Sequence, residues 1–121
     1  MLKEVRHPAQ IPGEPPRRVF GSAQLELIVW ESQSGDVEQF QLGYDLMERP
    51  RVLEFKSGLL HHYLVDRGPD LYTHIDRAGF LTPLAQIDRD FIATTFAQAS
   101  AELPAKIRNS VEHALTQLPG A

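Results

Sequence analysis

The chain has 121 residues, no cysteine and a formal net charge of −4 at pH 7. This length suits one domain with a single core. The lack of cysteine excludes a disulfide scaffold and cysteine-based metal or redox sites. The acidic balance argues against nucleic-acid binding. We therefore expect no nucleic-acid partner. Because the sequence has no signal-peptide core and no apolar run of about 20 residues, we also expect a cytoplasmic protein that does not bind membranes.

Residues 1 to 18 are predicted to form a proline-rich arm, and residues 19 to 121 a single α+β domain. Proline lacks a backbone donor and keeps the chain extended, so neither a helix nor a central strand is expected in the arm. Its prolines are Pro8, Pro12, Pro15 and Pro16. One hypothesis is that Arg17 and Arg18 bind a phosphate or the carboxylate of a partner. The alternative is a loosely ordered, solvated tail.

Residues 24 to 66 are predicted to form four antiparallel strands, and residues 19 to 23 either a lead-in strand or the start of the first. Turn signals stand at Ser34-Gly35, Met47-Glu48 and Ser57-Gly58. Two-residue turns at these points place the large apolar side chains on one face, whereas a slip by one residue would mix the two faces. The side chains expected on this buried face are Leu25, Leu27, Val29, Phe40, Leu42, Tyr44, Leu53 and Phe55.

The opposite face of the predicted sheet is mixed in character rather than cleanly polar. Apolar side chains such as Ile28, Trp30 and Leu59 are expected there among polar ones. Because aromatic residues are enriched at the centres of interfaces, we predict that this face binds another protein or a second copy of the chain. The candidate partner-binding residues of this face are Ile28, Trp30, Gln41 and Tyr63.

The same register aligns Gln41, Glu54 and His61 in one row across three strands. A neighbouring carboxylate favours the imidazolium and can orient the ring for acid–base chemistry. Glu54 and His61 are therefore the candidate catalytic residues of a small hydrolase or ligand-binding domain, and an exposed structural pair is the alternative. His62 points to the other face, because successive strand residues alternate. There we expect a buried neutral histidine bonded to a carbonyl.

Several stretches of this region resemble a family of small uncharacterised bacterial proteins. The shared features are an arginine pair followed by a phenylalanine and a LIVW strand in RRVFGSAQLELIVWES, then FQLGYD and LLHHYLVD. The resemblance covers roughly residues 11 to 66. It implies a compact bacterial domain, and it implies no activity and no site residues.

Residues 66 to 83 are the least regular part of the chain. Residues 66 to 70 are predicted to form a turn, and residues 71 to 75 are a candidate fifth strand. His74 and Asp76 are candidate metal ligands on one side of this extended segment. Zinc typically needs at least three protein ligands, so a solvated loop is the alternative. No phosphate loop, dinucleotide fingerprint or G-x-S-x-G motif occurs, and we expect no cofactor.

The last third of the chain is predicted to be helical and to cover the buried face of the sheet. Thr82-Pro83 has the form of a helix start, and Pro104 interrupts the pattern. The first apolar stripe comprises Leu84, Ile87, Phe91, Ile92, Phe96 and Ala99, and the second comprises Ile107, Val111, Ala114 and Leu118.

The predicted fold is thus α+β, with a four- or five-stranded antiparallel meander and one or two C-terminal helices on one face. Of the two function classes, a non-catalytic interaction or self-association module is favoured over an enzyme. Its expected assembly is a homodimer formed through the outer sheet face, unless the arm covers that face.

Overall fold

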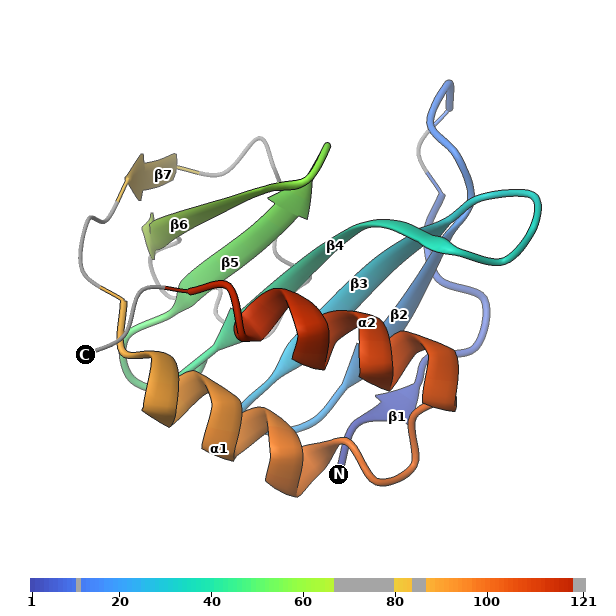
Figure 1. Ribbon diagram of the computed structural model, residues 1–121. Helices are drawn as coiled ribbons and strands as arrows, with labels where there is room; N and C mark the ends of the chain where they lie inside the picture. Colours follow the sequence, from blue (N-terminus) through green and yellow to red (C-terminus); the bar gives the residue numbers. More distant parts are fainter. Residues whose placement is uncertain (11, 67–79, 84–86, 119–121) are drawn as a thin grey trace.

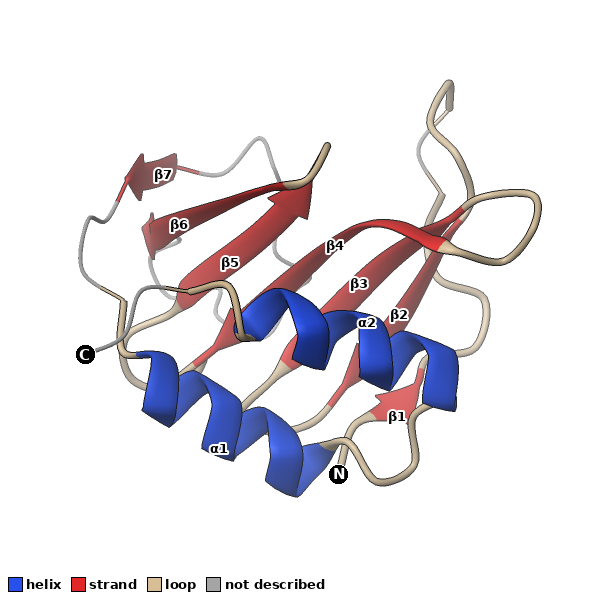
Figure 2. Cartoon of the chain, in the orientation of Figure 1, coloured by secondary structure: helices blue, strands red, loops and turns tan. Residues whose placement is uncertain are grey.

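The computed structural model describes residues 1–10, 12–66, 80–83 and 87–118. These residues form a seven-stranded antiparallel sheet, in which the strand order follows the chain order, with two helices on one face (Figures 1 and 2). The strands are β1 (Lys3–Glu4), β2 (Arg17–Gly21), β3 (Glu26–Glu31), β4 (Val37–Tyr44), β5 (Arg51–Lys56), β6 (Leu59–Asp66) and β7 (Phe80–Pro83). The helices are α1 (Arg89–Ala99) and α2 (Ala105–Leu115).

The predicted α+β class is confirmed, with an antiparallel sheet and two C-terminal helices. The predicted number of strands is wrong, because β1 and β2 extend the meander at one end and β7 extends it at the other. The candidate fifth strand over residues 71 to 75 lies outside the described residues. Within the described ranges, neither helix is long and apolar enough to cross a membrane.

The predicted register of the four central strands is confirmed. Its cross-strand pairs include Leu27–Leu42, Val29–Phe40, Phe40–Phe55, Leu42–Leu53, Leu53–His62 and Phe55–Leu60. The last hairpin has φ values of 54° at Ser57 and 76° at Gly58. Two positive φ values are what a two-residue type I′ turn requires, since this turn matches the twist of the flanking strands.

The first hairpin has the predicted register but not the predicted two-residue turn. The N–H of Ser32 donates to the carbonyl of Asp36 at 2.8 Å, so residues 33 to 35 form a three-residue loop. Gly35 has a φ of 86°, as the last position of such a loop favours. A β-bulge at Glu38 takes up the additional residue, and the predicted pairing resumes beyond it.

The main core lies between the sheet and the two helices, which run side by side across the same face of the sheet (Figure 1). The second helix, whose position the sequence left open, packs beside the first. The buried apolar side chains of this core include Leu27, Val29, Phe40, Leu42, Leu53, Ile92, Phe96, Ile107 and Val111. Phe55 was expected in the same set, and it is only partly buried.

The predicted burial of Phe91 is wrong, because this side chain is 41% exposed. Ile92 and Phe96 are buried and lie one helical turn apart, so they define the side of α1 that faces the core. Phe91 lies off that stripe and its ring is tilted against Tyr44, with centroids 6.0 Å apart.

The first helix starts later than predicted. Thr82 and Pro83 belong to β7, at the last position in the strand order, and an edge strand tolerates a proline. Helix α1 follows Asp88, whose Oδ1 accepts a hydrogen bond from the N–H of Phe91 at 3.1 Å. The predicted break at Pro104 is confirmed, since α2 begins at the next residue.

The N-terminal segment is part of the sheet, and the predicted boundary after residue 18 falls inside β2. Leu2 is buried in the main core, and its N–H donates to the carbonyl of Ala99 at 2.9 Å. Figure 1 accordingly shows β1 beside the end of α1. The burial of Leu2 was not predicted, because a single apolar residue in a proline-rich, charged stretch gives no periodic pattern.

Candidate functional site

The row of Gln41, Glu54 and His61 is present on the outer face in the predicted register. Nε2 of Gln41 donates to Oε2 of Glu54 at 2.8 Å. His61 is exposed, and its ring stacks on Tyr63 with centroids 6.3 Å apart. The carboxylate is therefore positioned by a buried amide, and the imidazole rests against an aromatic ring.

Of the four predicted partner-binding residues on the outer face, Ile28, Trp30 and Gln41 are buried within the chain itself, and Tyr63 is partly buried. Ile28 is 1% exposed and Trp30 is 4% exposed, and both pack with Val19 of β2. Strand β2 places Val19 directly opposite Ile28. The predicted four-stranded sheet did not include this pairing. Leu59, at 61% exposed, is the member of the predicted apolar set that faces solvent. This finding removes the exposed aromatic centre on which the predicted interface was based.

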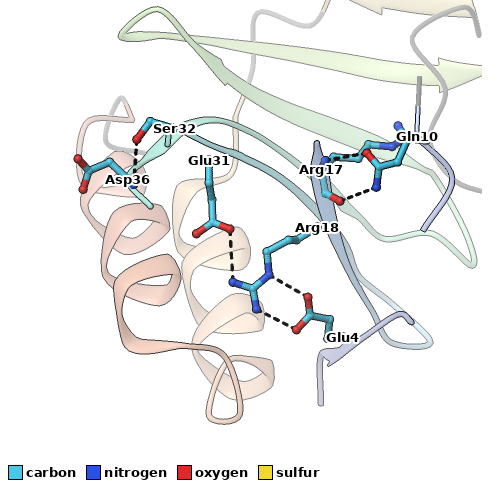
Figure 3. Close-up of polar contacts among 7 residues, drawn as sticks. All are labelled: Glu4, Gln10, Arg17, Arg18, Glu31, Ser32 and Asp36. Atoms are coloured by element: carbon cyan, nitrogen blue, oxygen red, sulfur yellow. Dashed lines mark hydrogen bonds and ion pairs between the residues drawn. The ribbon is translucent and has the colours of Figure 1, made fainter. Parts of the chain in front are cut away.

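Arg18 binds two carboxylates of its own chain (Figure 3). Its Nε and Nη2 donate to the two carboxylate oxygens of Glu4, each at 2.8 Å, and Nη1 donates to Glu31 at 3.4 Å. The guanidinium also lies over the ring of Phe20, 5.4 Å from its centroid. The hydrogen bonds from Arg18 lower the pKa of Glu4 below its usual value. Arg18 thus links β1, β2 and β3.

Arg17 binds the chain segment that precedes it (Figure 3). Its Nε donates to the carbonyl of Ala9 at 2.7 Å, and its backbone N–H donates to Oε1 of Gln10 at 2.9 Å. Nε2 of Gln10 in turn donates to the carbonyl of Arg17 at 3.1 Å. In the described structure, both predicted anion-binding arginines have partners within the chain.

A buried aromatic and polar cluster lies at the end of β4. The hydroxyl of Tyr44 is hydrogen-bonded to Nε2 of His62, and the two rings stack with centroids 5.8 Å apart. Burial raises the pKa of Tyr44 to about 12. The phenol is therefore protonated at physiological pH and can donate to the imidazole. The predicted burial of His62 is confirmed.

Arg51 lies against the Tyr44 ring of this pair. Its Nη2 donates to Oδ2 of Asp45 at 2.9 Å, and its guanidinium lies 4.6 Å from the centroid of the Tyr44 ring. The guanidinium also lies 5.9 Å from the centroid of the Phe91 ring, which is itself tilted against Tyr44, so the three side chains form one group. The register pairs Tyr44 with Arg51 and could have revealed their proximity, but no local motif marks a cluster assembled from three strands and a helix.

The structure does not test the candidate metal ligands, because His74 and Asp76 lie outside the described residues. Among the residues that are described, no three His, Asp or Glu side chains are grouped so that they could hold a metal ion.

One concave feature of the described surface is a groove between α1 and α2. Its volume is about 390 Å³. Phe96 and Leu115 are buried at its base, and the small side chains of Ala93 and Ala97 leave it open. Arg89 on α1 and Glu112 on α2 are further lining residues. The spacing of the two alanines is the signal in the sequence that could have pointed to this groove, since residues four apart share one side of a helix.

Comparisons of the chain with protein-family models, with curated proteins and with solved structures returned no match. The resemblance to small bacterial proteins, the cytoplasmic location and the homodimer stay predictions.

Proposed function

We propose that the chain is a non-catalytic protein-interaction or self-association module, and that its binding surface is the groove between α1 and α2. The observation that carries this proposal is the groove itself, which has apolar side chains at its base and about 390 Å³ of open volume. That volume falls in the range of about 300 to 1,000 Å³ typical of clefts that hold small molecules, so it has room for side chains of a partner. An amphipathic helix that inserts apolar side chains into such a groove is a common mode of recognition.

The distribution of polar groups also favours a binding role over catalysis. Two of the described charged clusters hold the sheet together: Arg18 of β2 binds Glu4 of β1, and Arg51 of β5 binds Asp45, which follows β4. An active site usually gathers several polar groups into one concavity. The groove instead has a mainly apolar lining, which suits a partner's apolar side chains.

Selection of peptides from a random helical library on the immobilised chain tests this proposal. We expect enriched peptides with apolar residues on one face, and at least tenfold weaker binding to Ala97→Phe, which fills the groove. Leu59→Ser, on the outer sheet face, is the matched control and should bind as the parent does. If no peptide is enriched, or if Ala97→Phe binds the selected peptides unchanged, the groove is not the binding surface.

A second candidate is a small hydrolase or ligand-binding domain that uses Gln41, Glu54 and His61. The hydrogen bond from Gln41 to Glu54 supports it, because it fixes a carboxylate beside an exposed imidazole. A panel of chromogenic esters and phosphoesters, assayed with the parent, Glu54→Gln and His61→Asn, is the test. Turnover that both substitutions abolish would favour this candidate, and equal rates in all three proteins would remove it.

A further inference from the structure

The groove between α1 and α2 carries one charge of each sign, and the two charges belong to opposite walls. Arg89 contributes from α1 and Glu112 from α2. Among the described residues, no ion pair joins the two walls. Each charge has instead a partner on its own helix: Arg89 lies 3.8 Å from Asp90, and Glu112 lies 4.0 Å from Arg108.

Both of these pairs within a helix are weak by their geometry. Residues that are adjacent in a helix, such as Arg89 and Asp90, do not face each other. Arg108 precedes Glu112 by four residues, which is the less favourable order of charges along a helix. Exposed ion pairs of this kind contribute little. Arg89 and Glu112 can therefore exchange their present partners for charges on another molecule.

We propose that the partner which occupies the groove is a second copy of this chain. In this homodimer, a two-fold axis runs along the groove, so that α1 of each copy faces α2 of the other. Arg89 of each copy then pairs with Glu112 of the other, since a two-fold interface makes every contact twice. The inference rests on the proposed function and names the partner of the same surface.

The shape of the groove suits this arrangement. Ala93 and Ala97 have small side chains, so the helices of two copies can approach closely. Helices that face each other in this way form a four-helix layer, a packing that buries apolar positions between them. Leu115, which is 4% exposed at the base of each groove, would lose its remaining access to water.

The size of the helical face sets the expected affinity. Each helix has 11 residues, which corresponds to a length of about 16 Å and a width of about 10 Å. Two such helices offer a face smaller than the standard contribution of about 800 Å² per partner. We therefore expect a dimer that dissociates in the micromolar range.

Analytical ultracentrifugation of the full chain from about 5 to 500 μM, in low salt, tests the pairing. We expect Arg89→Glu alone and Glu112→Arg alone to weaken the dimer at least tenfold, because each creates two repulsive contacts per dimer. The double variant in one chain should restore dimerisation to within about threefold of the parent. Lys56→Glu and Glu38→Arg, which make the same changes of charge on the sheet, are the controls and should behave as the parent.

Mixing the two single variants gives the sharpest test. In a heterodimer of Arg89→Glu with Glu112→Arg, both contacts join a glutamate to an arginine, so a 1:1 mixture should dimerise about as tightly as the parent, although each variant alone is at least tenfold weaker. Circular dichroism confirms that each variant is folded. A monomeric parent at every concentration, or a dimer that is insensitive to both reversals, overturns the inference. If peptides still bind the groove of a monomeric parent, only the identity of the partner is wrong, and the proposed function stands.

Discussion

The two faces of the sheet are built from the same strands and are buried in different ways. The inner face packs against both helices and belongs to one continuous core. On the outer face, the apolar side chains form two small clusters, one around Val19, Ile28 and Trp30 and another around Val52. Polar side chains, including the Gln41–Glu54 pair, lie beside them on the same strands.

This difference shows why alternation in a sequence does not by itself identify an exposed face. Ile28 and Trp30 alternate with the inner-face residues, so they point away from the helices. They are nevertheless buried, and strand β2 places Val19 against them. An apolar residue on the second face of a sheet can therefore be part of a satellite core, and burial within the chain has to be considered before an interface is proposed.

The largest expected effect is on the inner face. Phe40→Ala should lower the free energy of unfolding by about 3 to 5 kcal/mol, because it leaves a cavity in the continuous core. Urea denaturation measures this change. Phe91→Ala is the control, since this exposed side chain should cost much less. Equal losses of stability in the two variants would contradict the assignment of Phe40 to the buried core and of Phe91 to the exposed surface.

A smaller effect is expected for the satellite cluster on the outer face. Ile28→Ala should lower the free energy of unfolding by about 2 kcal/mol, near the lower limit for buried isoleucine, because a small cluster can relax around the vacancy. Urea denaturation of the parent and of Ile28→Ala compares the two faces directly. A loss below about 0.5 kcal/mol would mean that Ile28 is exposed in solution, as the predicted interface required.

The sequence was sufficient to predict the register of the central strands because three successive turns had to agree on one apolar face. Even where the turn itself was wrong, at residues 33 to 35, the bulge at Glu38 preserved the pairing of the apolar residues. The strands at the two ends of the sheet were harder to predict. Strand β1 has two residues, and β7 contains a proline that also fits a helix start.

The candidate sites were predicted less well, because they depend on which side chains meet across the fold. The register was enough to align Gln41 with Glu54, and the hydrogen bond between them agrees with it. It did not show that Arg18 finds Glu4, which requires knowing that β1 joins the sheet. The groove was also missed, since its volume depends on how two helices pack rather than on the pattern of either one.

Alkaline pH should weaken the polar end of the inner face. The pKa of Tyr44 is raised to about 12 by burial, whereas an unfolded tyrosine titrates near 10. The stability that depends on the protonated phenol is fully present below pH 10 and is lost as pH rises through the folded value. A difference of about two units corresponds to about 2 to 3 kcal/mol.

Urea denaturation between pH 9 and 12 measures this loss. Tyr44→Phe cannot ionise, so its stability should fall less steeply over the same interval, although the lost hydrogen bond to His62 lowers it by about 1 kcal/mol at neutral pH. Parallel pH profiles for the two proteins would show that the phenol of Tyr44 is accessible to solvent.

The smallest expected effect concerns the ion pair at the rim of the inner face, where Arg18 lowers the pKa of Glu4. A depressed pKa adds stability above the unfolded value, and this contribution is lost as pH falls through the folded one. Because both side chains are partly exposed, we expect this contribution to stability to be at most about 1 kcal/mol.

Glu4→Gln should remove this contribution to the loss of stability between pH 6 and 3, measured by urea denaturation. Glu48→Gln, a matched change on an exposed side chain outside the described ion pairs, should leave it intact. A profile for Glu4→Gln that coincides with the parent would mean that β1 is attached to the sheet by Leu2 and its backbone hydrogen bonds, without a measurable contribution from the charges.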